Sequence, residues 1–297
     1  MTVIDLEAPS THPGSVAAAL DRAVGILAGA GVPTPVVDAE LLIGHVLGLS
    51  RGGVQAKVIA GGTLDPDERL QVTELVERRA AREPLQHITG RAAFRSMELA
   101  VGPGVFVPRP ETEGVAGIAI EALRAAAQPQ PLAVDLGTGS GAIALAMATE
   151  VPHAYVYGVE LSPRAFVWTK QNFREQAPDN ARAVFIDLAD ALPELDGTVA
   201  VVASNPPYIP SAAIPRDPEV RLFDPEMALY GGEDGLDVVR QVSRTAQRLL
   251  HAGGTLVIEH GELQAVEIAA LLRADGWHAV AGHRDLLGRD RATTALR

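Results

Sequence analysis

The sequence predicts an α/β protein in which a small all-helical domain precedes a mostly parallel, doubly covered sheet. Two observations lead to this prediction. From residue 131 onward, apolar runs of strand length alternate with helical patterns, and that alternation is typical of parallel strands with helices on both faces. Before about residue 85, only helical periodicity is visible. The length of 297 residues allows for two domains of ordinary size.

Three helices are expected in the first domain, at 15–30, 35–49 and 65–82. Apolar residues recur at helical spacing in the first of them. At the start of the third, Asp65 can cap the helix, Pro66 suits the first turn, and Glu68 can complete a capping box. We therefore expect a helical domain over residues 1–85.

A linker over residues 86–110 should contain extended chain. In 91–107, apolar residues alternate around Gly102-Pro103-Gly104, which predicts a β-hairpin about that turn. The rigid segment Pro108-Arg109-Pro110-Glu111-Thr112-Glu113 then leads into a helix at 111–126. Residues 111–297 form the α/β domain, with seven expected strands at 132–135, 155–160, 183–187, 199–204, 255–259, 278–283 and 291–296. The helices between them are expected up to residue 149 and at 162–176, 233–251 and 261–275.

Composition narrows the classes of function. The chain carries 25 Lys and Arg against 37 Asp and Glu, a net charge of −12, which argues against a broad basic surface for nucleic acid. It has no cysteine, which excludes disulfides, thiolate metal sites and a cysteine nucleophile, and its histidines lack metal-ligand spacing. No uncharged apolar stretch reaches the roughly 18 residues of a membrane span, and no secretory signal is apparent. We expect a cytoplasmic protein with no metal and no membrane partner.

A glycine-rich turn follows the first strand of the α/β domain, with the sequence Asp135-Leu136-Gly137-Thr138-Gly139-Ser140-Gly141. Glycines permit close approach of the backbone, and the next helix offers free N–H groups. The turn fits either a dinucleotide or S-adenosylmethionine, and both need an acid about 20 residues later for ribose hydroxyls, which Glu160 supplies. Asp135 could lie near the amino acid end of the cofactor or only stabilise the turn.

The motif Asn205-Pro206-Pro207-Tyr208 decides between these cofactors. It follows the fourth strand, whose end should neighbour the glycine turn. A conjugated –NH2 group is a poor nucleophile unless its lone pair is aimed, and the Asn205 side-chain oxygen and the Pro206 carbonyl can each accept one of its N–H groups. The prolines stiffen the loop, and the Tyr208 ring offers a flat face. Hydride transfer has no use for such a loop, so we interpret the site as that of a methyltransferase.

The ordered set of motifs resembles the bacterial PrmC/HemK family of methyltransferases, which modify a glutamine of peptide chain release factors. The resemblance runs from about residue 15 to the end. Besides the glycine turn and Asn205–Tyr208, it rests on the segments at 83–90, 108–113, 231–236, 258–261 and 285–291. It implies a seven-stranded, Rossmann-like class I fold dependent on S-adenosyl-L-methionine, behind a helical domain that recognises the substrate.

The resemblance also implies roles for individual residues. Asn205, Pro206, Pro207 and Tyr208 would be catalytic and hold the glutamine of a Gly-Gly-Gln motif, whose side-chain amide nitrogen (N5) is methylated. The cofactor would be bound by Asp135, Gly137, Thr138, Gly139, Ser140, Gly141, Glu160, Asp187, Leu188 and Asn205.

Two positions depart from the pattern of the family. Glu160 replaces a common Asp, and Leu188 stands where an aromatic often lies beside the adenine. Asp187 could bond the adenine amine or be an ordinary acid at a strand end. Phe106, Arg109 and Glu111 could line the site, although ion pairs that anchor the hairpin are the favoured interpretation for Arg109 and Glu111.

Two alternatives remain at this point. Nucleic-acid N-methyltransferases share the Asn-Pro-Pro-Tyr chemistry, and five arginines that cluster in sequence could meet phosphate or an acidic partner: Arg78, Arg79, Arg82, Arg91 and Arg95. A non-catalytic protein with a degenerate cofactor fold would lack an intact glycine turn and Asn-Pro-Pro-Tyr motif, and both are intact here. The expected partners are therefore class I peptide chain release factors, with no direct nucleic-acid partner.

Overall fold

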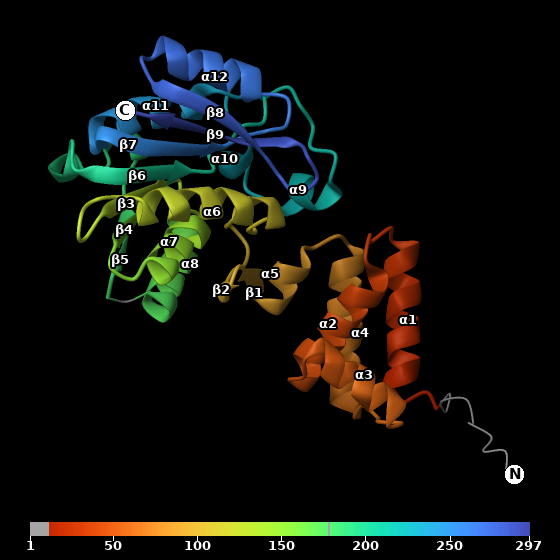
Figure 1. Ribbon diagram of the computed structural model, residues 1–297. Helices are drawn as coiled ribbons and strands as arrows, with labels where there is room; N and C mark the ends of the chain where they lie inside the picture. Colours follow the sequence, from red (N-terminus) through yellow and green to blue (C-terminus); the bar gives the residue numbers. More distant parts are fainter. Residues whose placement is uncertain (1–11, 178) are drawn as a thin grey trace, which may run out of the picture. The chain divides into compact units, whose positions relative to one another are not determined.

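The computed structural model describes residues 12–177 and 179–297, and the chain divides into two compact units (Figure 1). Unit 1 contains the described residues up to Gly90 together with Arg216–Phe223. Unit 2 contains Arg91–Pro215 and Asp224–Arg297. The chain therefore passes between the units three times, and the short segment 216–223 belongs to the helical unit although it lies far along the sequence.

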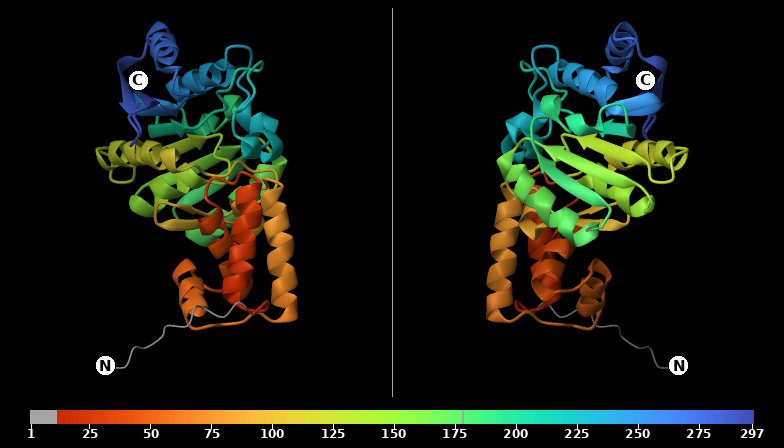
Figure 2. Two further views of the ribbon diagram at one scale, coloured as in Figure 1. Left: turned by 90° about the vertical axis from the view of Figure 1, so that its right-hand side faces the viewer. Right: turned by 90° about the vertical axis from the view of Figure 1, so that its left-hand side faces the viewer.

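Unit 1 is helical and has its own apolar core. Its helices are α1 (Val16–Gly29), α2 (Pro35–Leu47), α3 (Arg51–Ile59), α4 (Pro66–Ala80), α5 (Leu85–Thr89) and α9 (Pro218–Phe223). Helices α1 and α4 run side by side in both views of Figure 2. The predicted capping box begins α4: Asp65 accepts the Glu68 N–H and Glu68 accepts the Asp65 N–H, both at 2.8 Å.

Helix α3 was not predicted from the sequence. It begins with Arg51-Gly52-Gly53, and two glycines disfavour a helix by about 1 kcal/mol each. The Ser50 hydroxyl accepts the Gly53 N–H at 3.2 Å, and Val54 packs fully buried in the core of unit 1. Capping and tertiary packing therefore form this helix against its local propensity.

Unit 2 is built on a seven-stranded sheet in the order β5-β4-β3-β6-β7-β9-β8. Its strands are β3 (Leu132–Leu136), β4 (Tyr155–Glu160), β5 (Ala181–Phe185), β6 (Val199–Ser204), β7 (Leu250–Glu259), β8 (His278–Arg284) and β9 (Asp290–Leu296). The first five strands in this order are parallel, while β9 runs antiparallel to both of its neighbours. This confirms the predicted mostly parallel sheet, although β5 and β7 begin earlier than expected.

Helices cover both faces of this sheet (Figure 1). Helices α6 (Pro110–Arg124), α7 (Ala142–Glu150) and α8 (Pro163–Gln176) lie on one face, and α11 (Asp237–Leu249) and α12 (Ala265–Ala274) lie on the other; α10 (Glu226–Leu229) is a single turn. Successive side chains of β3 point to opposite faces of the sheet. Ala133 therefore joins the apolar core beneath α6, α7 and α8, which we call the first core of unit 2, and Val134 joins the core beneath α11 and α12, which we call the second. Strands buried on both faces explain the continuous apolar runs in the sequence.

The β-hairpin turns at a different place from the one predicted. Strands β1 (Arg91–Phe94) and β2 (Met97–Ala100) are joined by Arg95-Ser96, not by Gly102-Pro103-Gly104. The glycines serve close packing instead, because a Cβ at Gly102 would lie 2.4 Å from the Trp168 ring and one at Gly104 would lie 2.8 Å from the Arg164 Cβ. Among the described residues, no helix has both the length and the apolar character needed to cross a membrane.

Candidate functional site

The candidate site lies at the carboxyl ends of β3 and β6, where the order of the strands in the sheet reverses. From β3 the chain moves outward to β4 and β5, and on the other side of β3 it continues through β6 and β7. The carboxyl ends of two adjacent strands at such a point form the usual ligand crevice of an open α/β sheet. Here the Ser204 hydroxyl at the end of β6 donates to the Leu136 carbonyl at the end of β3, at 2.6 Å. This bond joins the glycine turn to the start of the Asn-Pro-Pro-Tyr motif.

The glycine turn has a backbone that other residues would strain. Gly137, Gly139 and Gly141 have φ angles of 75°, 57° and 93°, in the left-handed region. A Cβ at Gly137 or Gly139 would meet nothing within 4 Å, so the backbone there faces open space. At Gly141 the constraint is internal, because a Cβ would lie 2.8 Å from the Phe173 ring. The first two glycines thus leave room for a ligand against the backbone, and the third packs the turn.

Asp135 is buried beneath this turn with one oxygen free. Its Oδ2 accepts the Thr138 hydroxyl at 2.6 Å and the Ala144 N–H at 3.1 Å. Its Oδ1 has no hydrogen-bond partner among the described residues. Burial raises the pKa of Asp135 to about 7, although the Thr138 and Ala144 donors lower it. Asp135 therefore stabilises the turn and also keeps an acceptor that a cationic ligand group could use.

Glu160 ends β4 with its carboxylate turned toward the glycine turn. Its Oε2 accepts the Gly139 N–H at 2.8 Å and its Oε1 accepts the Ser162 N–H at 2.7 Å. Burial raises the pKa of Glu160, and the N–H donors of Ser162 and Gly139 oppose that rise. A carboxylate has about four acceptor positions, so Glu160 can still accept a hydrogen bond from a ligand hydroxyl. The longer side chain thus reaches the turn, and its free acceptors fit a ribose.

The end of β5 gives Asp187 a structural role. Its Oδ1 accepts the Ala189 N–H at 2.9 Å and caps the single turn Leu188–Asp190. Leu188 is half-buried and packs against the second core of unit 2. These contacts support the interpretation of Asp187 as an acid at a strand end. Adenine contacts of Asp187 and Leu188 stay predictions.

The Asn-Pro-Pro-Tyr motif is braced by a neighbouring glycine segment. A Cβ at Gly231 would lie 2.5 Å from the Pro207 carbonyl oxygen, and one at Gly235 would lie 2.4 Å from that of Tyr208. The Gln264 side chain also donates to the Tyr208 carbonyl at 2.9 Å. The backbone carbonyls of Pro207 and Tyr208 are therefore packed against the Gly231-Gly232-Glu233-Asp234-Gly235-Leu236 segment. Only glycine leaves room for this contact at Gly231 and Gly235.

The side chains of Asn205 and Tyr208 remain available for contact with a ligand. No hydrogen bond connects the Asn205 side chain to another residue in the part of the chain that the structure describes. Burial, followed by the charge of Glu259, raises the pKa of Tyr208 to about 12, so its phenol stays protonated at neutral pH. The motif thus presents a free amide beside a neutral aromatic ring.

Glu259 is a buried carboxyl next to this motif. It ends β7, is 2% exposed, and has an Oε2 without a hydrogen-bond partner among the described residues. Burial raises its pKa to about 7, while the Thr112 side chain and the Arg291 charge lower it. The following His260 is fully buried, and its Nε2 lies 2.9 Å from the Thr293 hydroxyl.

The residues expected on the hairpin side of the site form ion pairs. Arg109 pairs with Asp224 at 2.7 Å, and its guanidinium lies 4.9 Å from the centroid of the Phe106 ring. Glu111 pairs with Arg289 at 2.9 Å. These contacts support the anchoring alternative for Arg109 and Glu111.

Sequence reasoning missed Asn172, a fully buried polar residue on α8. Its Nδ2 donates to the Ser140 carbonyl at 2.8 Å and to the Ala100 carbonyl at 2.9 Å, and its Oδ1 accepts the Ala100 N–H at 2.7 Å. Thr169, one turn earlier, donates to the Gly139 carbonyl at 2.6 Å. The two residues tie the glycine turn to α8 and the hairpin. Their only sequence signal is polar residues on one face of a helix.

The arginines that cluster in sequence are paired with carboxylates. Arg78 contacts Glu83 at 2.6 Å, and Arg91 lies 3.7 Å from Glu98. Arg95 pairs with Glu150. The partners of Arg79 and Arg82 are likewise acidic. This pairing gives no support to a phosphate-binding face at these five positions.

Comparisons with known proteins agree with this architecture. A family model described as the PrmC N-terminal domain matches residues 18–90, and one described as the methyltransferase small domain matches residues 97–223. Over 271 residues the chain is 49% identical to a release factor glutamine methyltransferase of Streptomyces coelicolor, covering 91% of this chain and 93% of that protein.

Two further similarities are to proteins that are not named as release factor methyltransferases. The chain is 41% identical to a 4-amino-L-phenylalanine/4-methylamino-L-phenylalanine methyltransferase of Streptomyces pristinaespiralis, over 95% of each chain. Among solved structures, the human Mettl16 catalytic domain in complex with a 3′UTR hairpin superposes with a TM-score of 0.51 at 14% identity, covering 67% of this chain and 75% of that one. This last similarity shows the fold alone.

Proposed function

This chain belongs to the family of release factor glutamine methyltransferases, and we propose how its own residues transfer a methyl group from S-adenosyl-L-methionine to the side-chain amide nitrogen (N5) of a release-factor glutamine. The observation that carries the proposal is the 2.6 Å bond between Ser204 and Leu136, which fixes the Asn-Pro-Pro-Tyr motif beside the glycine turn. A cofactor against the turn and an amide at the motif would then share one crevice.

The residues around the glycine turn suit the cofactor. Gly137 and Gly139 leave open space over their backbone, Glu160 keeps acceptors for the ribose hydroxyls, and the free Oδ1 of Asp135 suits the amino group of the methionine part. When bound, the cofactor supplies an electrophilic methyl group on its sulfonium sulfur. The chain must then aim a weak nucleophile at that carbon.

Asn205 and Pro206 would aim the glutamine amide. The Asn205 side-chain oxygen and the Pro206 carbonyl each accept one N–H of the substrate, which directs the nitrogen lone pair at the methyl carbon. The same acceptors favour the more positive nitrogen of the transition state. Because Pro207 and Tyr208 are braced by Gly231, Gly235 and Gln264, the backbone of the loop that carries these acceptors is held in place before the substrate arrives. Positioning of this kind can contribute up to about 7–11 kcal/mol.

The substrate class follows from the family and from charge. We propose the glutamine of the Gly-Gly-Gln motif in class I release factors as the target, with the helical unit recognising the protein, and the cytoplasm as the place of reaction. The net charge of −12 and the carboxylate-paired arginines favour a protein over a nucleic acid.

A single labelling experiment tests this function. Methyl-labelled S-adenosyl-L-methionine is incubated with the enzyme and, separately, with a purified release factor, its Gly-Gly-Gln→Gly-Gly-Glu variant, total RNA, DNA and 4-amino-L-phenylalanine. Label on the wild-type factor alone supports the proposal. Label on RNA or DNA would favour a nucleic-acid N-methyltransferase, and label on the aromatic amine would move the substrate to a small molecule.

The Asn205→Ala variant tests the role of the motif. Losing one positioned polar group should lower turnover by about 10²–10³-fold, by analogy with the loss of an oxyanion-hole donor. The dissociation constant of S-adenosyl-L-methionine, measured by calorimetry, should change little. An equal loss of cofactor binding would show that Asn205 shapes the cofactor pocket rather than the amide site.

A further inference from the structure

The chain makes an excursion directly after the Asn-Pro-Pro-Tyr motif. Ile209 donates its N–H to the Leu229 carbonyl at 2.9 Å, and Ser211 donates to the Gly232 carbonyl at 2.8 Å, so both ends of the excursion are held in unit 2. The segment Arg216–Phe223 between them belongs to unit 1. We call this segment the excursion segment.

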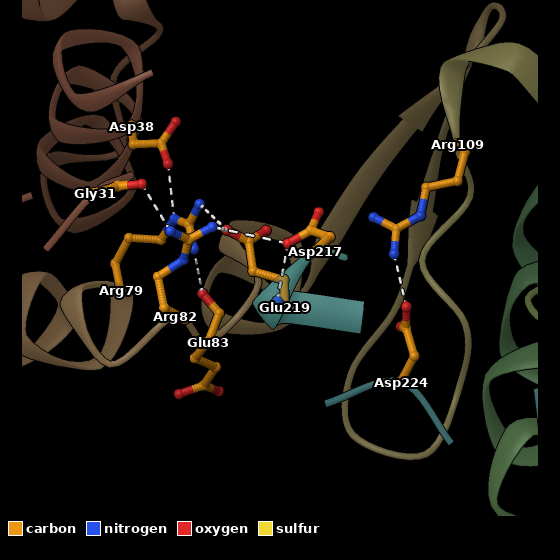
Figure 3. A network of polar contacts seen from close by, with 9 residues as sticks. All are labelled: Gly31, Asp38, Arg79, Arg82, Glu83, Arg109, Asp217, Glu219 and Asp224. Carbon is orange, nitrogen blue, oxygen red and sulfur yellow. Dashed lines mark hydrogen bonds and ion pairs between the residues drawn. The ribbon is translucent and has the colours of Figure 1, made fainter. Parts of the chain in front are cut away.

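Two arginines of unit 1 hold the excursion segment through one carboxylate (Figure 3). Nη2 of Arg79 lies 2.7 Å from Oε1 of Glu219, and Nη2 of Arg82 lies 2.9 Å from the same oxygen. Arg79 is 4% exposed and also donates to Asp38 at 2.7 Å. A buried guanidinium is costly unless its donors are satisfied, so Glu219 completes a set of partners that the N-terminal helices leave open.

The backbone of Arg82 indicates that its side chain is needed there. Arg82 lies two residues beyond the end of α4 with a φ of 69°, a position that glycine usually fills. A non-glycine residue is strained in this region. Its guanidinium offsets that strain by donating to the Gly31 carbonyl at 2.7 Å and to Glu219. The turn alone would favour glycine at this position, so the hydrogen bonds of the side chain explain why an arginine lies there.

The far end of the excursion segment leads to the candidate site. Phe223 is followed by Asp224, whose side chain is fully buried and pairs with Arg109 at 2.7 Å. Arg109 lies over the Phe106 ring. The excursion therefore starts at Tyr208 and ends at the ion pair of Asp224 with Arg109. The ion pairs to Glu219 therefore restrict residues that short stretches of chain join to both places.

We propose that Arg79 and Arg82 are positioning residues, which hold the excursion segment through Glu219 and thereby set the loop that receives the glutamine-bearing part of the release factor. This inference rests on the proposed function. It assigns the helical unit an indirect part in the reaction besides recognition of the substrate. Neither arginine touches the reacting atoms in this scheme.

Two substitutions weaken the contacts that hold the segment. Glu219→Gln removes the shared negative charge while Arg79 keeps Asp38, and Arg82→Gly removes the guanidinium at a φ that glycine adopts freely. The matched control is Glu226→Gln, which removes an exposed carboxylate from the same excursion. Trypsin cleavage after the exposed Arg221 reports opening of the segment, because that bond lies within α9.

We expect both variants to be cut after Arg221 about 10-fold faster than wild type, as befits the loss of a hydrogen bond between charged groups. KM for the intact release factor should rise and kcat/KM should fall by about 10-fold, with the dissociation constant of S-adenosyl-L-methionine unchanged. Glu219→Asp, which keeps the charge, should restore part of the loss. Glu226→Gln should match wild type in every measurement.

Two results would overturn the proposal. Unchanged cleavage would show that the ion pairs do not hold the segment, and faster cleavage with unchanged kcat/KM would show that the reaction does not depend on that hold. If the wild-type enzyme leaves the release factor unmodified, the proposed function itself fails and takes this inference with it. The trypsin rates would then still show whether the arginines hold the segment.

Discussion

Replacing Glu259 with glutamine should stabilise unit 2 at alkaline pH and much less at acidic pH. Glu259 is 2% exposed, and burial raises its pKa from 4.5 to about 7. Between these two values the folded state binds more protons than the unfolded state, so stability falls as pH rises through that window. At about 1.4 kcal/mol per pKa unit, the loss approaches roughly 3 kcal/mol above pH 8. Glutamine has a similar shape and carries no charge at any pH.

Fluorescence gives a direct assay, because both tryptophans of the chain, Trp168 and Trp277, lie in unit 2. Urea unfolding is followed for wild type and Glu259→Gln at pH 5 and pH 8. The variant's free energy of unfolding, relative to wild type, should increase by about 2 kcal/mol from pH 5 to pH 8. The control Glu262→Gln removes an exposed carboxylate three residues away and should show no such increase.

If the free energies of unfolding of Glu259→Gln and wild type differ by the same amount at both pH values, the predicted protonation of Glu259 is wrong. That result would mean that Glu259 stays ionised in the folded protein at pH 5, with the Arg291 charge outweighing burial. Loss of stability in the variant at pH 8 would carry the same meaning, because an ionised and well-compensated carboxylate would then be the more stable group.

Three other substitutions test the supports of the two units. Asn172→Leu should destabilise unit 2 by about 3 kcal/mol and weaken cofactor binding, because it strands buried donors and acceptors in the hairpin and the glycine turn; urea unfolding and calorimetry measure both effects. Gly235→Ala should lower turnover more than cofactor affinity, because its Cβ would press on the Tyr208 carbonyl, whereas Gly253→Ala, also at positive φ but in open space, should cost only stability. Asp65→Ala should destabilise unit 1 by about 1 kcal/mol, seen as faster hydrogen exchange of the first turn of α4.

The sequence predicted the features that depend on residues close together in the chain, such as helix caps, the glycine turn and the apolar strands. The capping residues Asp65 and Glu68 begin α4 as expected, and the glycine turn and Asn205 lie at adjacent strand ends. Alternation of strands and helices predicted the parallel sheet, because burial on both faces imposes continuous apolar runs. For the site, the sequence predicted that the Asn-Pro-Pro-Tyr motif and the glycine turn follow neighbouring strands, and the bond between Ser204 and Leu136 joins those two strand ends.

Features that depend on distant partners escaped prediction. The glycines Gly102 and Gly104 suggested a turn, but they make room for side chains of α8, roughly 60 residues later in the chain. Asn172 shows in the sequence only as a polar residue on a helix face, because its three bonds join segments that only the fold brings together. Glu219 is separated from Arg79 by 140 residues, and no periodicity reveals such a pair.

The membership of the excursion segment in unit 1 also sets an order in biosynthesis. A ribosome completes all five N-terminal helices long before it reaches Glu219, so Arg79 of nascent unit 1 can pair with the carboxylate of Asp38 but not yet with that of Glu219 while about 140 further residues are added. At about 5–20 residues per second, that interval is on the order of ten seconds. During that time the nascent helical unit is less stable than in the finished protein. A chain that stopped at Gly90 would lack Glu219, so an exchange of the helical unit between relatives would have to include residues 216–223 to keep these ion pairs.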